Sequence, residues 1–576
     1  MDQQLGRREE DEADEADEDD DDDEEEDWND DDDVDYELHF DEEALLRLER
    51  NDPLVGGLVI DGTYWTERAG RVIGDSTLLS HLTIVVRVAK KNANGSSSSS
   101  PRWLDELFSG LARNRSIESI AFPRTGDGRN HRYDYEYKVT SPIRHSRRLD
   151  NFHLLAPFFE CNCHLQVIEI EEFDLSAVLI PLGAAMSKCK DSQLKSLTLG
   201  GNIFEDDQAA QFVQSLNEKP HLQNLHFYGN TIVNMERGNL CYEIAQLISN
   251  PASTIRELSI WHTTAFDDTC LAILGYALRG KNGLNSLELL GNHAISANGW
   301  RSFFGVLSSP TCGITKLSLQ NTPMDSDGLA SLGETLALST TLQSLDMSRN
   351  PSIDAAGWKR FFECLRSPEA AAKSLDISSC NINNELAIMI ATVLEQKTCL
   401  KGLRMLWNER ITLAGWKRFF NIMLKCNSCC SLEELVLMFI SDDMERRHEK
   451  LETCLSHRLC NESSIDNIYS SNHTLQLVAV FRNWSPELRC LFELNKNMDK
   501  AAVAREKILD RHFFSGGETN KVQVFDQMPR ATLPYSLEWI GRGNTCRGFS
   551  LLFTLVKEFP LLFKVCNSED VQADVN

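Results

Sequence analysis

The sequence predicts an α/β solenoid in which parallel strands line one face and helices line the other. A helix signature of the form Gly-Trp-x-x-Phe-Phe recurs every 58 residues, at Gly299–Phe304, Gly357–Phe362 and Gly415–Phe420. Each Trp stands eight residues after an Asn that closes a strand pattern rich in leucine, so strand and helix recur together. Such a period is typical of a stacked array of repeats, because each unit buries its apolar face only against its neighbours.

The strand of each unit follows the pattern Leu-x-x-Leu-x-Leu-x-x-Asn, as in Leu194, Leu197, Leu199 and Asn202. Alternating apolar residues place one strand face inside, and a buried Asn side chain can bond the backbone where the strand turns. Several units replace the closing Asn, which leaves their turn geometry open: Thr263, Thr322, Cys380 and Ile440. Ten units, with starts 28 to 33 residues apart, are expected at Leu165, Leu194, Leu222, Ile255, Leu284, Ile314, Leu342, Ala372, Leu400 and Leu432.

Between the strands the apolar spacing changes to that of a helix, as in Trp358, Phe361, Phe362 and Leu365. Each unit is therefore a strand followed by a helix. The Trp-Phe-Phe stripe is interpreted as core packing against the sheet rather than as a surface for stacking a ligand.

This pattern resembles the leucine-rich repeat, in the long-unit variety typified by ribonuclease inhibitor. The resemblance covers residues 165–440 and implies a horseshoe of parallel strands and helices. Four segments are expected: a disordered acidic tail (1–43), a flanking region with degenerate repeats and a basic insertion loop (44–150), the leucine-rich repeat array (151–445), and a repeat remnant with a helical C-terminal cap (446–576). Degenerate strands near Ile84 and Phe122 extend the pattern toward the N-terminus.

The tail is defined by its charge. Residues 9–33 hold 21 Asp or Glu among 25 positions, and like charges keep such a segment extended. It is interpreted as a solvating tail. Alternatively, the tail binds a basic protein, and its own residues Trp28, Tyr36, Leu38 and Phe40 serve as apolar anchors. The basic segment 124–148 either pairs with this tail or is ordinary solvated charge.

The composition sets limits on location and cofactors. No stretch of the chain reaches 18 uncharged apolar residues, and the N-terminus is acidic where a secretory signal is basic and then apolar. An intracellular protein, cytoplasmic or nuclear, is expected. The 17 cysteines are odd in number and scattered, which favours reduced thiols. The cluster Cys426–Cys430 lacks a second pair of ligands, so neither a metal nor a cofactor is expected.

The predicted function is a non-catalytic scaffold that binds a protein partner on the concave face of the array. Residues between the buried strand positions form a ladder there, and an aromatic pair beside histidines is typical of a protein-binding hot spot. Carboxylates at one strand position favour a partner of complementary charge. The candidate contact residues are Asn224, His226, Tyr228, Glu257, Trp261, Glu288, Leu290, Asp346, Asp376, Arg404, Leu406 and Trp407.

Two other functions stay open. Ran GTPase-activating proteins resemble the chain in having long leucine-rich repeats and an acidic tail, although theirs is C-terminal, and no motif here marks the arginine such an activator needs. An acidic-tail chaperone for basic proteins is the other alternative. No motif of an enzyme is found. Binding to nucleic acid is disfavoured because only residues 124–148 are basic, and no membrane partner is expected.

Overall fold

The structure is a computed structural model. It describes residues 37–66, 68–86, 102–123, 147–148, 151–234, 238–263, 266–279, 283–309, 311–366, 371–395, 400–425, 431–438, 444–480, 483–508 and 510–511. The predicted tail up to residue 36, the basic segment 124–146 and the cluster Cys426–Cys430 lie outside this part of the chain. So do residues 512–576.

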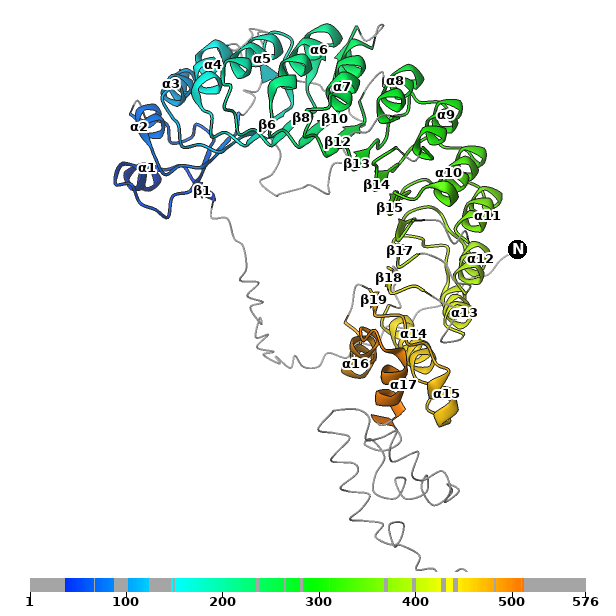
Figure 1. Cartoon of the computed structure of the whole chain (residues 1–576). Helices are drawn as coiled ribbons and strands as arrows, with labels where there is room; N and C mark the ends of the chain where they lie inside the picture. Colours follow the sequence, from blue (N-terminus) through cyan, green and yellow to red (C-terminus); the bar gives the residue numbers. More distant parts are fainter. Residues whose placement is uncertain are drawn as a thin grey trace, which may run out of the picture.

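The described chain forms one long parallel sheet that curves along the inner side of a horseshoe (Figure 1). Successive strands pair in register, so equivalent positions of neighbouring units face each other. The 15 strands in spatial order are β1 (Glu37–His39), β2 (Gly57–Ile60), β3 (His81–Ile84), β4 (Ser119–Phe122), β6 (Val167–Glu171), β8 (Ser196–Gly200), β10 (Asn224–Tyr228), β12 (Glu257–Trp261), β13 (Ser286–Glu288), β14 (Lys316–Ser318), β15 (Ser344–Asp346), β16 (Ser374–Asp376), β17 (Gly402–Arg404), β18 (Glu434–Val436) and β19 (Leu477–Ala479).

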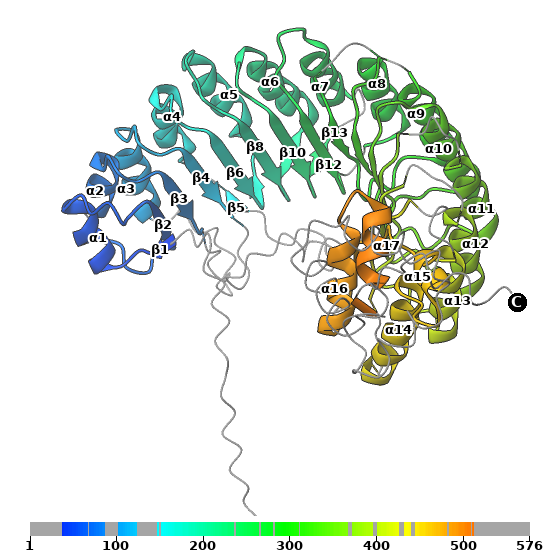
Figure 2. The same cartoon turned by 60° about the horizontal axis from the view of Figure 1, so that its bottom comes forward.

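Helices cover the outer, convex side, as both views show (Figures 1 and 2). The strand-and-helix alternation confirms the predicted α/β solenoid. The helices are α1 (Glu42–Glu49), α2 (Ala69–Asp75), α3 (Arg102–Leu111), α4 (Phe152–Cys161), α5 (Leu179–Lys188), α6 (Asp206–Ser215), α7 (Asn239–Ser249), α8 (Asp268–Leu278), α9 (Ala297–Leu307), α10 (Ser326–Leu338), α11 (Ala355–Cys364), α12 (Asn384–Leu394), α13 (Leu413–Met423), α14 (Met444–Leu459), α15 (Ile465–Tyr469), α16 (Pro486–Asn495) and α17 (Lys500–Ile508).

A second, small parallel sheet lies where four of the strands end. Its strands run in the order β11 (Thr231–Val233), β9 (Ile203–Glu205), β7 (Phe173–Asp174) and β5 (Arg147–Arg148). Because β5 pairs with β7, Arg147 and Arg148 lie beside the unit of β6 and β7.

Where a unit closes with Asn, the Asn side chain is bonded to the unit before it. The Asn350 side chain donates to the Leu319 carbonyl oxygen at 2.9 Å and accepts from the Thr322 N–H at 2.9 Å. Asn408 does the same with Ile377 and Cys380. Because a buried amide left without partners is costly, this arrangement ties neighbouring units together and explains the Asn in the pattern.

The Trp-Phe-Phe stripe lies in the core, as predicted. Trp300 and Trp358 are fully buried, and Trp416 is nearly so. The two phenylalanines of each helix pack against their Trp, with ring centroids 5.6–6.3 Å apart. These aromatic clusters fill the space between the helices and the sheet.

One residue in each of nine units adopts the left-handed conformation directly before the position of the closing Asn. We call these residues the turn row. Their φ angles lie between 45° and 62°, where only glycine is free of steric strain. The turn row consists of Glu172, Gly201, Gly229, His262, Gly291, Asn321, Arg349, Ser379 and Trp407.

At the N-terminal end the sheet begins earlier than the predicted array. Strand β1 and the start of helix α1 lie inside residues 1–43, the range predicted for the tail. The Asp41 side chain accepts a hydrogen bond from the Ala44 N–H at 2.8 Å and so caps α1. An acidic residue that looks like part of the charge run is therefore a helix start signal.

Helices α14–α17 form the helical cap at the other end, next to β19 (Figure 1). Lys507 of α17 is fully buried, and its ammonium donates to the Leu459 and Asn472 carbonyl oxygens at 2.8 and 3.2 Å. Burial lowers the pKa of Lys507 to about 7. This lysine joins three segments of the cap.

Candidate protein-binding surface

The concave face is built from the strand residues that alternate with the buried leucines. Parallel pairing in register aligns them into rows that run along the array. We call the part of one such row that runs from β10 to β17 the central row; it has three acidic members, followed by a basic one on β17. It consists of His226, Ser259, Glu288, Ser318, Asp346, Asp376 and Arg404. The predicted acidic ladder is thus a real row, with Ser318 between Glu288 and Asp346.

A second row, which we call the exit row, lies two residues further along the strands. Its register runs from Glu171 through Gly200 and Tyr228 to Trp261. The Tyr228 ring lies over Gly200, where an added Cβ would stand 2.1 Å from a ring carbon. The Tyr228 hydroxyl donates a hydrogen bond to Glu171, two strands away. Gly200 is therefore required for Tyr228 to lie flat across strand β8.

Tyr228 and Trp261 lie against each other, with ring centroids 5.7 Å apart. Trp261 is half-buried, whereas Tyr228 is only 9% exposed. The sequence suggests two equal aromatic contact surfaces, whereas the structure exposes Trp261 more than Tyr228. Tyr228 backs Trp261, and Trp261 presents the accessible indole.

Glu288 fixes the indole of Trp261. One carboxylate oxygen, Oε2, accepts from Trp261 Nε1 at 3.1 Å and from the Ser259 hydroxyl at 2.7 Å. Because that donation uses the Ser259 proton, the contact of 2.9 Å between Ser259 Oγ and His226 Nδ1 requires His226 to donate. Four side chains from three neighbouring strands thus form one connected network. Burial raises the pKa of Glu288, and the two hydrogen bonds it accepts oppose that shift.

The acidic part of the central row continues on β15 and β16. Asp346 and Asp376 each accept a bond of 2.9 Å from the backbone N–H two residues later, Ser348 and Ser378. Burial raises the pKa of Asp376, and the neighbouring Asp346 carboxylate adds to the shift. Two carboxylates of the central row thus stand on adjacent strands, Asp346 opposite Asp376.

Asp376→Asn should raise the melting temperature at about pH 7 and lose this advantage near pH 4, where carboxyl groups become protonated. The folded-state pKa of Asp376 lies above the unfolded-state value, so the folded protein binds the proton more tightly. Stability therefore falls as pH rises from the unfolded-state pKa through the folded-state pKa. An amide removes this loss and keeps an oxygen that accepts from Ser378. Thermal melts at both pH values measure the effect.

The exposed Glu409 provides the matched control for that experiment. Glu409→Gln removes the same charge outside the acidic row. An equal rise in the melting temperature of both variants would assign the gain to net charge and contradict a specific role of the row.

The other predicted contact residues have different settings. Asn224 and Glu257 lie opposite each other on β10 and β12, two residues before the central-row residues His226 and Ser259. Leu290 and Leu406 are half-buried at the exit end of their strands. Trp407, by contrast, belongs to the turn row with φ 57° and is 48% exposed. It lies in the turn that follows β17, three residues after Arg404 of the central row.

Sequence reasoning missed three contributors to this surface. Glu171 and Gly200 complete the support of Tyr228, and the Gln320 amide donates to Asp346. Gly200, the last residue of β8, was the only hint in the sequence that a ring could lie across that strand. The acceptor Glu171 has no such signal, because it lies 57 residues from Tyr228 in sequence.

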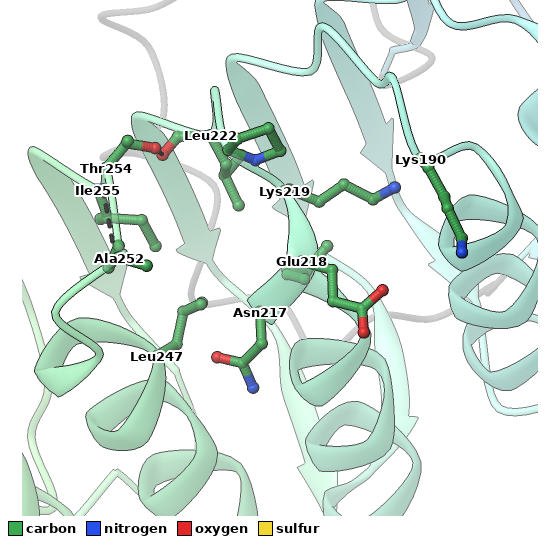
Figure 3. Close-up of a pocket in the computed structure, with 12 residues that line it drawn as sticks. Lys190, Asn217, Glu218, Lys219, Leu222, Leu247, Ala252, Thr254 and Ile255 are labelled. Carbon is green, nitrogen blue, oxygen red and sulfur yellow. Dashed lines mark hydrogen bonds between the residues drawn. The ribbon is translucent and has the colours of Figure 1, made fainter.

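A shallow depression of 270 Å³ lies elsewhere, between the turns before β10 and β12 (Figure 3). Lys219 extends from one of these turns, and its ammonium donates to the Met186 and Cys189 carbonyl oxygens at 2.6 and 2.9 Å. Burial lowers the pKa of Lys219. The lysine thus holds neighbouring loops together.

Within the ranges given above, no group of three or more His, Cys, Asp or Glu side chains is placed to hold a metal ion. Among the same residues, no helix has the length and apolar character needed to cross a membrane.

The sequence is similar to known repeat proteins. It is 28% identical over 218 residues to the NACHT, LRR and PYD domains-containing protein 9 of Bos taurus, covering 38% of this chain and 21% of that protein. It is 34% identical over 164 residues to the ribonuclease inhibitor of Sus scrofa, covering 28% of this chain and 35% of that protein. The matches thus span about a fifth to a third of these relatives.

No family model matches the chain. Among solved structures, the Rad7 and Elc1 complex in yeast aligns with a TM-score of 0.38 and 16% identity, covering 65% of this chain and 81% of that one. The register of the strands, the bonded Asn that closes several units and the two named relatives all indicate leucine-rich repeats. The chain is a leucine-rich repeat protein, and its repeats are similar to those of ribonuclease inhibitor.

Proposed function

We propose that the chain is a non-catalytic scaffold that binds a protein partner on its concave face, with Trp261 as the central anchor. The observation that carries the proposal is the fixed indole, held by the Glu288 carboxylate on one side and the Tyr228 ring on the other. A large side chain that is already ordered loses little conformational entropy when it is covered. Tryptophan in such a setting is typical of a binding hot spot.

The charge of the concave face supports a basic partner. On the outward positions of β6–β18, carboxylates outnumber basic side chains, of which there are two, Lys316 and Arg404. Complementary charge speeds association and excludes partners of the same sign. The carboxylates on these positions are Glu169, Glu171, Glu257, Glu288, Asp346, Asp376 and Glu434.

The last three strands of the array add apolar surface beside the charged side chains of Arg404 and Glu434. Leu406, Val436 and Ala479 are half-buried on this part of the sheet, and Leu477 is 42% exposed. The partner is therefore expected to place basic groups over β12–β16 and an apolar contact over β17–β19. The name of ribonuclease inhibitor states that it acts on another protein, which supports protein binding as the use of this array.

Carboxyl footprinting tests the proposal. The immobilised full chain retains a partner from an extract, and a carbodiimide with an amine then labels accessible carboxylates with and without that partner. Labelling of Glu257, Asp346 and Asp376 should fall on binding. Labelling of Asp327 and Glu363, which are exposed on the convex helices, should stay the same. Protection of the convex pair alone would contradict binding on the concave face.

Neither alternative function gains support from the described residues. The GTPase-activator and acidic-tail chaperone readings stay predictions of the sequence.

A further inference from the structure

A groove of about 400 Å³ lies in the helical cap, between α16 and the end of α17. This volume falls in the range of roughly 300–1,000 Å³ that is usual for binding sites. The groove is lined by Pro486, Glu487, Cys490, Leu491, Leu494, Lys507, Asp510 and Arg511. The end of a solenoid needs a polar outer face to stay soluble, so a groove with an apolar wall at this end is a candidate docking surface.

One face of α16 supplies the apolar wall. Pro486, Cys490 and Leu494 follow one another at intervals of four residues and therefore lie on the same side of the helix. Pro486 and Cys490 are exposed and Leu494 is half-buried, whereas Leu488 and Phe492 are buried in the core. Helix α16 thus has apolar side chains on two sides, and the described residues cover only one of them.

We propose that residues Leu551–Phe563 of the same chain dock in this groove and complete the cap. Nine of these 13 residues are Leu, Val or Phe, and Lys557 and Glu558 are the only charged ones. Covering the wall of α16 with such side chains removes apolar surface of both from water, which favours docking. This inference is independent of any partner on the concave face.

The course of the chain brings the segment within reach of the groove. Arg511, the last residue that the structure describes, itself lines the groove. About 40 residues separate it from Leu551, and a chain of that length spans at most roughly 140 Å. Because the segment belongs to the same chain, its effective concentration at the groove is about millimolar, so a modest affinity is enough to keep it bound.

The charges around the groove indicate how the segment is placed. Arg511 lies 3.2 Å from the Glu462 carboxylate and 3.6 Å from that of Asp510, so its charge is already compensated. Glu487 is exposed, and no basic side chain among the described residues pairs with it. Lys557 is therefore assigned to Glu487, because complementary charge fixes the register of a docked segment.

Cross-linking of the purified full chain tests this placement. A carbodiimide joins a carboxylate to an amine only where the two are in contact, and mass spectrometry identifies the linked peptides. An amide bond between Glu487 and Lys557 within one chain is expected. Glu493 is the internal control: it is exposed on the same helix outside the groove, and it should link to Lys496, whose ammonium lies 2.6 Å away.

The exposed thiol of Cys490 reports on the same groove. Phe559→Asp combined with Leu562→Asp should release the segment and speed alkylation of Cys490 by about tenfold. This factor holds for a segment at an effective concentration of about 1 mM that binds with a dissociation constant of about 0.1 mM. Val571→Asp, which adds a charge outside the segment, should leave the rate unchanged. Cys161 is exposed on α4 and serves as the reference thiol in every sample.

Several results would overturn the proposal. A link between Glu487 and Lys557 that appears only in cross-linked dimers would assign the groove to a second copy of the chain. Links from Lys557 only to carboxylates outside the groove, or no link at all, would contradict docking. An unchanged rate at Cys490 in the double variant would show that the parent groove is open. If Cys161 also reacts faster, the variant has unfolded, and the cross-link in the unaltered chain decides the question.

Discussion

Trp358→Ala should lower the free energy of unfolding by about 3–5 kcal/mol, the range typical of a large aromatic side chain lost from a core. Trp358 is fully buried, and its ring meets Phe361 and Phe362 at centroid distances of 5.8 and 6.0 Å. Removal leaves a cavity between α11 and the sheet that rigid neighbouring units fill poorly. Denaturant or thermal melts of the full chain measure the loss.

Lys359→Ala is the matched control, because this residue follows Trp358 on the same helix and is exposed. It should change stability by only a few tenths of a kcal/mol, as is usual for surface positions. Similar melting curves for the two variants would remove Trp358 from the core and would contradict the packing described for all three aromatic helices.

Trp261→Ala should weaken binding of the retained partner by about thirtyfold or more, since truncation of a hot-spot residue costs about 2 kcal/mol or more. The substitution removes the accessible indole and leaves the Glu288 carboxylate with one donor fewer. Dissociation constants of parent and variant, measured by titration with the purified partner, give the effect.

Two further variants separate contact from support. Tyr228→Phe keeps the ring that backs Trp261 and removes only the bond to Glu171, so a much smaller loss is expected. Tyr276→Ala removes an aromatic side chain that is 79% exposed on the convex helix α8 and should leave binding unchanged. A larger loss for Tyr276→Ala than for Trp261→Ala would move the interface to the helices.

The fold was predictable because the pattern of core residues recurs many times in the sequence of a repeat protein. The ten expected units correspond to strands β6 to β18, and each unit repeats the same buried positions. The strands β1 and β2 were harder to find, since their units carry the pattern only in part. Asp41 shows why: an acidic residue that caps a helix looks the same as one in a charged tail.

For the binding surface, the sequence predicts which strand residues align into rows, but not how exposed each side chain is. The strand register follows from the repeat, so the alignment of Glu288, Asp346 and Asp376 follows as well. The difference in exposure between Tyr228 and Trp261 does not follow, because it depends on which ring crosses Gly200. The position of Trp407 depends on its positive φ angle. A Trp side chain disfavours this angle, and the repeat pattern does not predict it.

The turn row has a consequence for how the array evolves. Left-handed backbone costs roughly 1–2 kcal/mol per residue that carries a Cβ, yet only three of its nine members are glycine. The other six positions carry side chains where glycine would relax the backbone, and they occupy the same turn in each unit, so these turns form one rim of the array. Thermodynamic stability and a varied rim thus compete at each of these positions. Replacing these six residues by glycine should therefore stabilise the scaffold, but it would remove the side chains that distinguish the turns from one another.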